Sequence, residues 1–253
     1  MADSEKSAPT PKTPVKSRLE VRSRNPNHLP SLYEYLATFA PEAAWLSDDV
    51  TPGPNTRHES YRYSDIVYPV QPWAEFTLSA CETRFRELLH DAVVTADAVF
   101  VTPQKGDESK AVASERGVGD YVNRTLSVQL NRAADRVGVA FPGKAIRLVG
   151  DYKVSWKWRS EWRHARPMTP KDIEYRQALS QVHCYMRRHQ CRWGYIVTDR
   201  EFVAVERDER KRGLLRVAEA VPWERRPGEP WGVAFASWFL HALAAQAHAW
   251  PLP

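Results

Sequence analysis

Cysteine is scarce in this chain and irregularly placed. The sequence has three cysteines among 253 residues, at Cys81, Cys184 and Cys191. An odd and widely spaced set cannot form a disulfide framework, and no C-x-x-C pair suggests a zinc site. We therefore expect a protein of a reducing compartment, and the cytoplasm is the predicted location.

The sequence also lacks a long uninterrupted apolar run. Its longest apolar stretch, residues 231–250, is rich in alanine and is interrupted by His241, Gln246 and His248. Such a stretch favours a buried helix over a membrane span. Residues 1–16 are rich in Ser, Pro and Lys and have no apolar segment, which argues against a signal peptide or an anchor. We expect no membrane partner.

Two nucleotide-binding signatures are missing as well, because neither a Walker-type loop nor a dinucleotide glycine pattern occurs. The length and the 43% of hydrophobic residues suffice for one sizeable core. We predict a flexible arm over residues 1–28 and a single α/β domain over residues 29–253.

Lys and Arg outnumber Asp and Glu by 36 to 31. This mild excess suits a polyanionic partner, and it equally suits a basic surface without one.

Helical periodicity and capping signals predict several helices. Ser31 and Glu34 have capping-box spacing ahead of a short helix that ends before Pro41. Apolar spacing predicts further helices over residues 73–95, 121–134 and 171–189. The proline-rich residues 48–72 are expected to form a surface loop, and the polar residues 102–118 a mobile segment.

Two β-hairpins are predicted in the second half of the chain. Residues 136–141 and 145–156 flank Pro142-Gly143, a pair that favours a tight turn, so we expect an antiparallel pair. Residues 193–197 and 202–206 flank the polar turn Asp199-Arg200 and predict a second hairpin. The expected fold is a mixed central sheet of two hairpins flanked by helices.

Polar side chains converge on the first predicted hairpin. A turn centred on Pro142-Gly143 places Asp135 opposite Asp151 or its neighbour. The period of a strand puts a polar row on one face, and a solvent-facing surface with incidental charges is the alternative interpretation. On the following helix, a polar stripe runs at steps of four residues and can dock beside that row. The row is Asp151, Lys153, Ser155 and Lys157, and the stripe is Gln177, Gln181 and Tyr185.

These segments resemble a known set of motifs. D-R at 135–136, D-Y-K at 151–153 and Q-V-H-C-Y at 181–185 are similar to the D-R, D-x-K and Q-x-x-x-Y elements of the PD-(D/E)XK nuclease-like superfamily, particularly its RecB-like branch. The resemblance implies that two carboxylates, Asp135 and Asp151, bind magnesium while Lys153 positions a water. It also implies an acidic residue on an upstream helix, for which Glu82 is our choice, with Glu75 and Glu87 as competitors.

An aromatic and basic segment follows the lysine. Tryptophans alternate with cations over residues 156–163, as in platforms for stacked bases and phosphates. The alternative is that these rings seal the edge of the sheet. We interpret the segment, with cations of the following helix, as a nucleic-acid contact. Its residues are Trp156, Lys157, Trp158, Arg159, Trp162 and Arg163, joined by Gln177, Arg187 and Arg188.

The ordered chain as a whole resembles the fungal arginine-containing cyclodipeptide synthases. That resemblance implies an enzyme of secondary metabolism that joins the aminoacyl groups of arginyl-tRNA and a second aminoacyl-tRNA, with no cofactor and no metal. The resemblance assigns no role to a particular residue. Our own hypothesis is that Asp135 or Glu82 reads the arginine side chain and that Asp151 and Lys153 handle protons, with Gln181 and Tyr185 nearby. Ser155 is a candidate acyl acceptor. Two other classes stay open: a magnesium-dependent nuclease, and a non-catalytic nucleic-acid-binding module on the same scaffold.

Overall fold

A computed structural model gives the fold of the chain. It describes residues 30–38, 44–46, 53–92, 94, 111–112, 114–127, 146–208, 210–226, 228–246 and 251–252. The predicted arm over residues 1–28, Asp135 and the first strand of the first predicted hairpin lie outside the described residues. The facing of Asp135 and Asp151 therefore stays a prediction.

A mixed sheet forms the centre of the described structure. Its strand order is β2-β7-β6-β5-β4, and β8 pairs with β6 off this path. β4 and β5 are parallel, as are β2 and β7, whereas β6 is antiparallel to β5, β7 and β8. The strands are β2 (Gln71–Pro72), β4 (Leu148–Tyr152), β5 (Trp193–Val197), β6 (Glu201–Arg207), β7 (Leu215–Val217) and β8 (Val221–Pro222). A separate parallel pair joins β1 (Trp45–Leu46) to β3 (Ala111–Val112).

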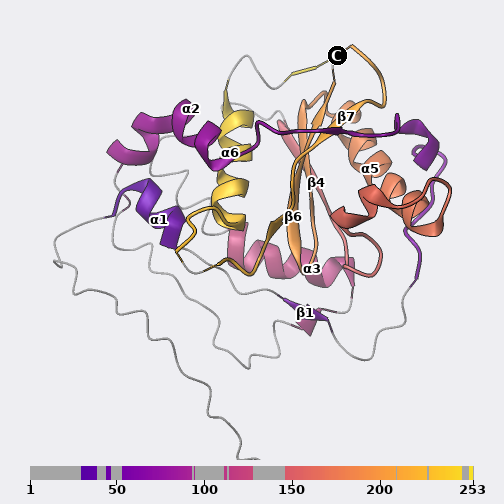
Figure 1. The fold of residues 1–253 in the computed structure, drawn as a ribbon, viewed down its shortest axis with the longest axis horizontal. Helices are drawn as coiled ribbons and strands as arrows, with labels where there is room; N and C mark the ends of the chain where they lie inside the picture. Colours follow the sequence, from indigo (N-terminus) through magenta and orange to yellow (C-terminus); the bar gives the residue numbers. More distant parts are fainter. Residues whose placement is uncertain are drawn as a thin grey trace, which may run out of the picture.

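Helices cover both faces of the sheet. Figure 1 shows α5 (Pro170–Arg188) on one side, with α1 (Leu32–Thr38), α2 (Leu78–Asp91) and α6 (Val233–Ala245) on the other. The strand period explains the two cores, because successive side chains point to opposite faces. Ile196 and Val203 pack in the cluster that contains the α5 side chains, and Val197 and Phe202 pack with α6. The expectation of a mixed α/β domain is confirmed.

The second predicted hairpin is confirmed, since β5 and β6 pair antiparallel around the turn at Asp199. The strand after the first predicted turn differs from its prediction. β4 spans five residues and ends at Tyr152, because the chain turns at Ser155–Lys157. It pairs in parallel with β5 across α5, which local sequence patterns cannot indicate.

Capping residues fix several helix ends. The Ser31–Glu34 capping box is confirmed: the Ser31 backbone N donates to the Glu34 carboxylate at 2.9 Å, and the Glu34 backbone N donates to Ser31 Oγ at 3.2 Å. Thr77 caps α2 and Thr169 caps α5, each accepting a hydrogen bond from a backbone amide. α5 follows its prediction within one residue at each end.

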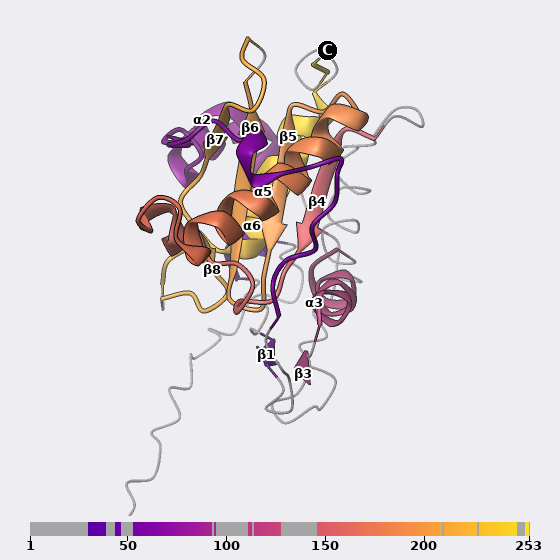
Figure 2. The same ribbon diagram turned by 90° about the vertical axis from the view of Figure 1, so that its right-hand side faces the viewer.

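The helix predicted at residues 121–134 begins six residues earlier. α3 (Glu115–Val122) is capped by Ser114 and continues as one π-helical turn, η3 (Asn123–Ser127), and residues 128–134 lie outside the described residues. Two glycines weaken its sequence signal. Gly119 favours close packing, because an added Cβ would lie 3.1 Å from the ring of Tyr152 on β4, which is tighter than an ordinary van der Waals contact. α3 can therefore lie close to the end of β4 (Figure 2).

The apolar stretch near the C-terminus forms the buried helix α6, as predicted. Two short 3-10 helices complete the described elements, η1 (Tyr63–Asp65) and η4 (Ser160–His164). Over the described part of the chain, every helix is too short or too polar to cross a bilayer.

Candidate functional site

A buried lysine lies at the centre of the candidate site. Lys153 directly follows β4, and its side chain is 0% exposed. An ammonium group out of water is costly unless several acceptors surround it, and three residues supply them here. Lys153 Nζ lies 2.9 Å from Asp151 Oδ2, 3.3 Å from Glu115 Oε1 and 3.0 Å from Gln181 Oε1. We call these four residues the lysine cluster.

β4 positions two members of the cluster. Asp151 and Lys153 are two residues apart, so the pleat of an extended chain sends both side chains to one face. The Lys153 backbone N donates to the carbonyl of Val197 at 2.9 Å, which extends the pairing with β5 past the end of β4. The two side chains are thereby held at the carboxyl end of a parallel strand pair.

α5 supplies the neutral members of the site. Gln181 and Tyr185 are one helical turn apart, and the Gln181 amide donates to the Tyr185 hydroxyl at 2.8 Å. This bond orients the amide so that its oxygen accepts from Lys153. Two members of the predicted polar stripe thus lie beside the end of β4, whereas the third, Gln177, binds the backbone of residues 56–61.

α3 supplies the second carboxylate. Glu115 occupies the first turn of α3, where Ser114 caps the helix and a negative charge is favoured by the helix dipole. Its Oε1 lies 3.3 Å from Lys153 Nζ and 3.3 Å from Lys157 Nζ. The Lys157 side chain is 22% exposed and that of Glu115 is 30% exposed. One carboxylate therefore bridges a buried lysine and a solvent-accessible one.

Burial and charge compete at the cluster. Burial raises the pKa of Asp151, and the nearby Lys153 ammonium lowers it, with burial the stronger influence. Burial lowers the pKa of Lys153, but Asp151 and Glu115 together outweigh it, so its pKa is raised. Lys153 accordingly stays protonated, and the carboxyl of Asp151 is more easily protonated than that of an exposed aspartate.

A segment ahead of α2 covers the site. We call residues 53–62 the strap; Figure 2 shows it passing in front of the sheet beside α5. Asn55 Nδ2 donates to the carbonyls of Lys157 and Glu174 at 2.9 and 3.3 Å. Gln177 donates to the carbonyls of Thr56 and Tyr61. Gln177 therefore holds the strap in place, and its expected role in substrate binding stays a prediction.

Tyr61 brings the strap to the cluster. Its pKa is raised by burial and then by Tyr185, while Lys153 lowers it and Asp151 raises it. The Tyr61 carbonyl accepts from the Gln177 amide at 3.4 Å, one helical turn before Gln181, so Tyr61 lies beside the part of α5 that contributes to the cluster. Sequence reasoning missed Tyr61, since a long-range hydrogen-bond clamp leaves no local pattern. It also missed Glu115, which Ser114 followed by an acidic residue could have indicated as a helix start.

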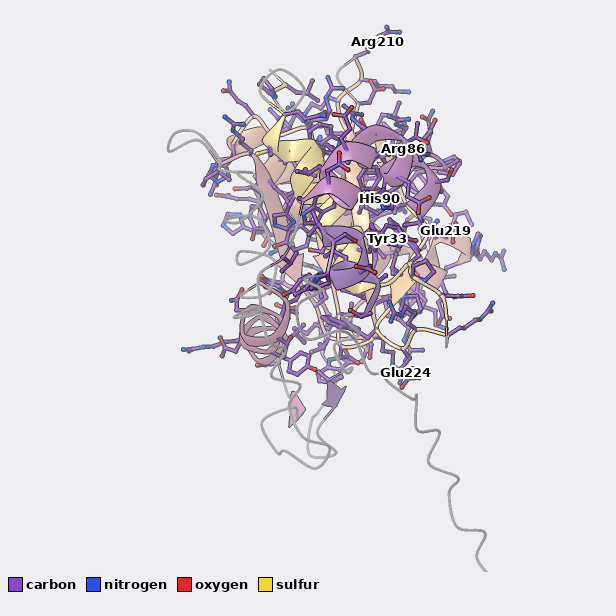
Figure 3. All side chains as sticks on the ribbon, turned by 90° about the vertical axis from the view of Figure 1, so that its left-hand side faces the viewer. Tyr33, Arg86, His90, Arg210, Glu219 and Glu224 are labelled. Atoms are coloured by element: carbon purple, nitrogen blue, oxygen red, sulfur yellow. The ribbon has the colours of Figure 1, made fainter. Side chains whose placement is uncertain are left out.

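The expected upstream acid, Glu82, lies elsewhere. It lies on α2, on the opposite side of the sheet from α5 (Figure 1). There its carboxylate interacts with the Tyr33 hydroxyl; burial is the larger cause of the raised Tyr33 pKa, and Glu82 raises it further. Figure 3 shows Tyr33 on that face. The competitor Glu75 pairs with Arg216 at 3.3 Å. The carboxylate that meets Lys153 comes instead from α3.

Ser155 does not point into the cluster. Its Oγ donates to Asp199 Oδ2 at 2.8 Å, and its backbone N donates to Asp199 Oδ1 at 2.7 Å. The expected row of four side chains is broken after Lys153 because the chain turns there. Asp199, interpreted from sequence as a turn residue, is buried and fixes that turn.

The tryptophans of residues 156–163 mainly pack inside the molecule. Trp158 is 0% exposed, stacks on Tyr175 and donates its Nε1 hydrogen to the Tyr175 carbonyl at 3.2 Å. Trp156 and Trp162 are partly buried against the two cores. The alternative in which these rings seal the sheet fits their positions, and Trp158 offers no face to a base.

The predicted cations of the same region divide into two groups. Arg159 donates to the Ser155 carbonyl at 2.9 Å, and Arg163 donates to the Ala218 carbonyl at 2.8 Å, so both brace the backbone. Arg187 and Arg188 are exposed at the end of α5. Of the two groups, Arg187 and Arg188 are the more exposed.

The described residues hold no group of three His, Cys, Asp or Glu side chains suited to a metal ion. Glu115 and Asp151 are two oxygen donors that meet at one point, and a hard divalent cation there requires further ligands. Asp135, the expected partner of Asp151 in a magnesium site, lies outside the described residues.

No family model, curated protein or solved structure matches this chain. The site is therefore interpreted from its own geometry.

Proposed function

We propose that the chain is an aminoacyl-tRNA-dependent cyclodipeptide synthase that uses arginyl-tRNA and a second aminoacyl-tRNA to form an arginine-containing diketopiperazine. One observation carries the proposal: two carboxylates from different elements, Glu115 and Asp151, converge on a buried ammonium group. Both groups that this reaction must handle, a guanidinium and an α-ammonium, are cations that carboxylates bind.

Glu115 is suited to reading the arginine side chain. Its carboxylate is partly exposed and already holds the solvent-accessible ammonium of Lys157 at 3.3 Å. A substrate guanidinium can displace that lysine and form two parallel hydrogen bonds with the carboxylate. Glu115 takes this role in place of Glu82, which lies on α2. Asp135, the other expected reader of arginine, stays a prediction.

Asp151 is suited to proton transfer. Burial raises its pKa above the ordinary value of an aspartate, and a carboxyl with a raised pKa is better suited to accept and return a proton. In the first step the α-amine of one aminoacyl group attacks the ester carbonyl of the other. The C–N bond forms, the ester C–O bond breaks, and the proton lost by the amine passes through Asp151 to the leaving ribose oxygen. A second, identical exchange closes the ring and releases the other tRNA.

Lys153 is suited to stabilise charge. Its raised pKa keeps it protonated, so it acts as a fixed cation for the oxyanion that develops on the attacked carbonyl. Gln181 and Tyr185 orient it, and the ester substrates are already activated, so no nucleotide cofactor is needed. We assign no acyl-acceptor role to Ser155, since its hydroxyl is bound to Asp199.

We also propose that the domain has the PD-(D/E)XK nuclease-like fold. β4 ends in the D-Y-K motif, α5 carries Q-x-x-x-Y, and the parallel β4–α5–β5 unit brings both motifs to one site. A magnesium-dependent nuclease is the second candidate, and the observation that favours it is the same pair of carboxylates beside a lysine, which suits a metal-bound water.

Expression of the chain in a bacterial host, followed by mass spectrometry of the medium, tests the proposal. We expect a new cyclic dipeptide that contains arginine, and its loss in Glu115→Gln. Glu161→Gln is the matched control, because Glu161 is 67% exposed and pairs only with nearby Arg159 among the interactions described. If no such product forms, and the purified chain instead cleaves nucleic acid in a chelator-sensitive manner, the chain is a nuclease.

A further inference from the structure

A cationic surface lies at the other end of the sheet from the lysine cluster. The turn between β6 and β7 leaves the end of β6 where Glu206 pairs with Trp193, the first residue of β5. Lys153 lies beside Val197, the last residue of β5. Four residue steps of strand separate these points by about 13 Å. Figure 2 shows the turn and α3 at opposite ends of the molecule.

The turn presents three consecutive cations to solvent. Arg210, Lys211 and Arg212 are exposed, and Figure 3 shows Arg210 projecting from this end. The turn is held from inside: Asp208 Oδ1 accepts from the backbone N of Arg210 at 2.7 Å and of Lys211 at 2.9 Å. The Asp208 carboxylate is therefore hydrogen-bonded to the backbone of the turn. Glu209 lies outside the described residues.

The turn is also tied to a neighbouring segment. Gly213 has a φ of 79°, and its carbonyl accepts from the backbone N of Val67 at 2.9 Å. A side chain at Gly213 would meet the Asp65 carbonyl at 2.1 Å. Because the turn is fixed at its base, its cations are displayed in one place, which lowers the entropy cost of binding a ligand.

A polar cavity continues this surface. Its volume is about 340 Å³, and its lining includes Arg192, Arg207, Arg210 and Arg216 with Glu206 and Asp208. Glu206 is paired with Arg216. Four guanidinium groups against two carboxylates leave a positive excess, and planar guanidinium groups match the oxygens of phosphates.

The end of α5 adds to the same charge. Burial, followed by Arg187, Arg207 and Arg212, lowers the pKa of His183 to about 4. α5 ends at Arg188, five residues before Trp193, and Trp193 pairs with Glu206 at the end of β6 from which the turn leaves, so the end of α5 and the turn lie at the same end of the sheet. Arg187 and Arg188 are exposed there.

We propose that this basic end, composed of Arg187, Arg188, Arg192, Arg210, Lys211 and Arg212, binds the phosphate backbone of RNA. Its assignment to tRNA rests on the proposed function. RNA fits better than a membrane surface, because the described residues have only Ile146 and Met168 as exposed large apolar side chains, too few for insertion. The body of the RNA docks at this end, and its unpaired 3′ end extends along the molecule to the lysine cluster.

Binding of a fluorescein-labelled, uncharged tRNA, measured by anisotropy at several salt concentrations, tests this surface. We expect the triple variant Arg210→Gln/Lys211→Gln/Arg212→Gln to bind about tenfold or more weakly, with the salt slope of log K reduced by about two to three. The matched control is Arg166→Gln/Lys171→Gln/Arg226→Gln, which removes equal charge from exposed positions elsewhere. It should bind within about twofold of the parent chain. Circular dichroism melts check that both variants fold.

The proposed RNA-binding role of this surface is refuted if the parent chain does not bind tRNA, or if the turn and control variants lose affinity equally. It is also refuted if the parent chain binds phosphatidylserine vesicles and not tRNA. Failure of the proposed function looks different: no diketopiperazine forms from charged tRNAs, while the turn variant still loses affinity for uncharged tRNA. With an active enzyme, the turn variant should raise KM for charged tRNA and leave kcat largely unchanged.

Discussion

Removing the Lys153 ammonium should strongly destabilise the fold. In Lys153→Met the chain keeps a side chain of similar length, but Asp151, which is 13% exposed, loses the cation that lies 2.9 Å away. Leaving a buried charge without its partner costs about 3–5 kcal/mol. For a chain of this size that corresponds to a fall in Tm of roughly 6–20 °C.

Neutralising both partners should recover most of this loss. Replacing a buried ion pair by uncharged side chains of similar volume is close to neutral, so the double variant Lys153→Met/Asp151→Asn should be more stable than Lys153→Met alone. Arg226→Met is the control, because Arg226 and Glu229 form a pair in which the side chains are 86% and 53% exposed. Loss of such a pair costs no more than about 1 kcal/mol.

The loss in Lys153→Met should also depend on pH. Burial raises the folded-state pKa of Asp151 above its ordinary value of 3.8, so the folded state binds this proton more tightly than the unfolded state. Its stabilising effect is present below the unfolded pKa and is lost as pH rises through the folded pKa. Removing Lys153 raises that pKa further, so the difference from the parent chain should be larger at pH 7 than at pH 4.

Denaturant titrations at both pH values give the free energies of unfolding of five proteins: the parent chain, Lys153→Met, Asp151→Asn, the double variant and Arg226→Met. The reasoning is refuted if Lys153→Met loses no more stability than Arg226→Met, or if the effects of Lys153→Met and Asp151→Asn simply add. Additive effects would mean that the two side chains are not coupled.

Three further predictions concern the surroundings of the site. Gly119→Val should push α3 away from Tyr152, because a Cβ at position 119 would lie 3.1 Å from the Tyr152 ring. Product formation should then fall strongly, while the far-ultraviolet circular dichroism spectrum changes little; unchanged activity would contradict the close packing. His183 should cost the parent chain about 3 kcal/mol of stability on acidification from pH 6.5 to 4, because the unfolded chain binds a proton on this ring more readily than the folded chain, in which its pKa is about 4. His183→Gln should not show this loss, and an unchanged pH profile in denaturant titrations would refute the prediction. Ser155→Ala should cost about 1–3 kcal/mol in the same titrations, because buried Asp199 loses the hydroxyl that donates at 2.8 Å; a neutral substitution would show that the bond does not stabilise the turn.

Local patterns were sufficient for the elements that form from nearby residues. α5, the β5–β6 hairpin and the Ser31 cap follow from helical period, turn residues and capping spacing, all of which act over a few residues. The strand period also placed Asp151 and Lys153 on one face, and in the structure they are 2.9 Å apart. The chemistry of that face could therefore be anticipated.

Long-range contacts determined the rest. The parallel pairing of β4 with β5 depends on packing across α5, and the strap is held by Asn55 and Gln177 reaching residues 102 to 121 positions away. Glu115 was missed because α3 contains glycines that lower its helix propensity. Trp158 was misread because alternation with cations does not distinguish a surface platform from a ring packed on Tyr175.

Product formation by purified protein at saturating charged tRNA tests the central claim most directly. The parent chain and Asp151→Asn are supplied with arginyl-tRNA and a mixture of other aminoacyl-tRNAs, and the cyclic dipeptide is quantified by mass spectrometry. If the lysine cluster performs the proton transfer, Asp151→Asn should form product about 100-fold or more slowly while binding uncharged tRNA with unchanged affinity. Product formed by Asp151→Asn at the parental rate would contradict the account.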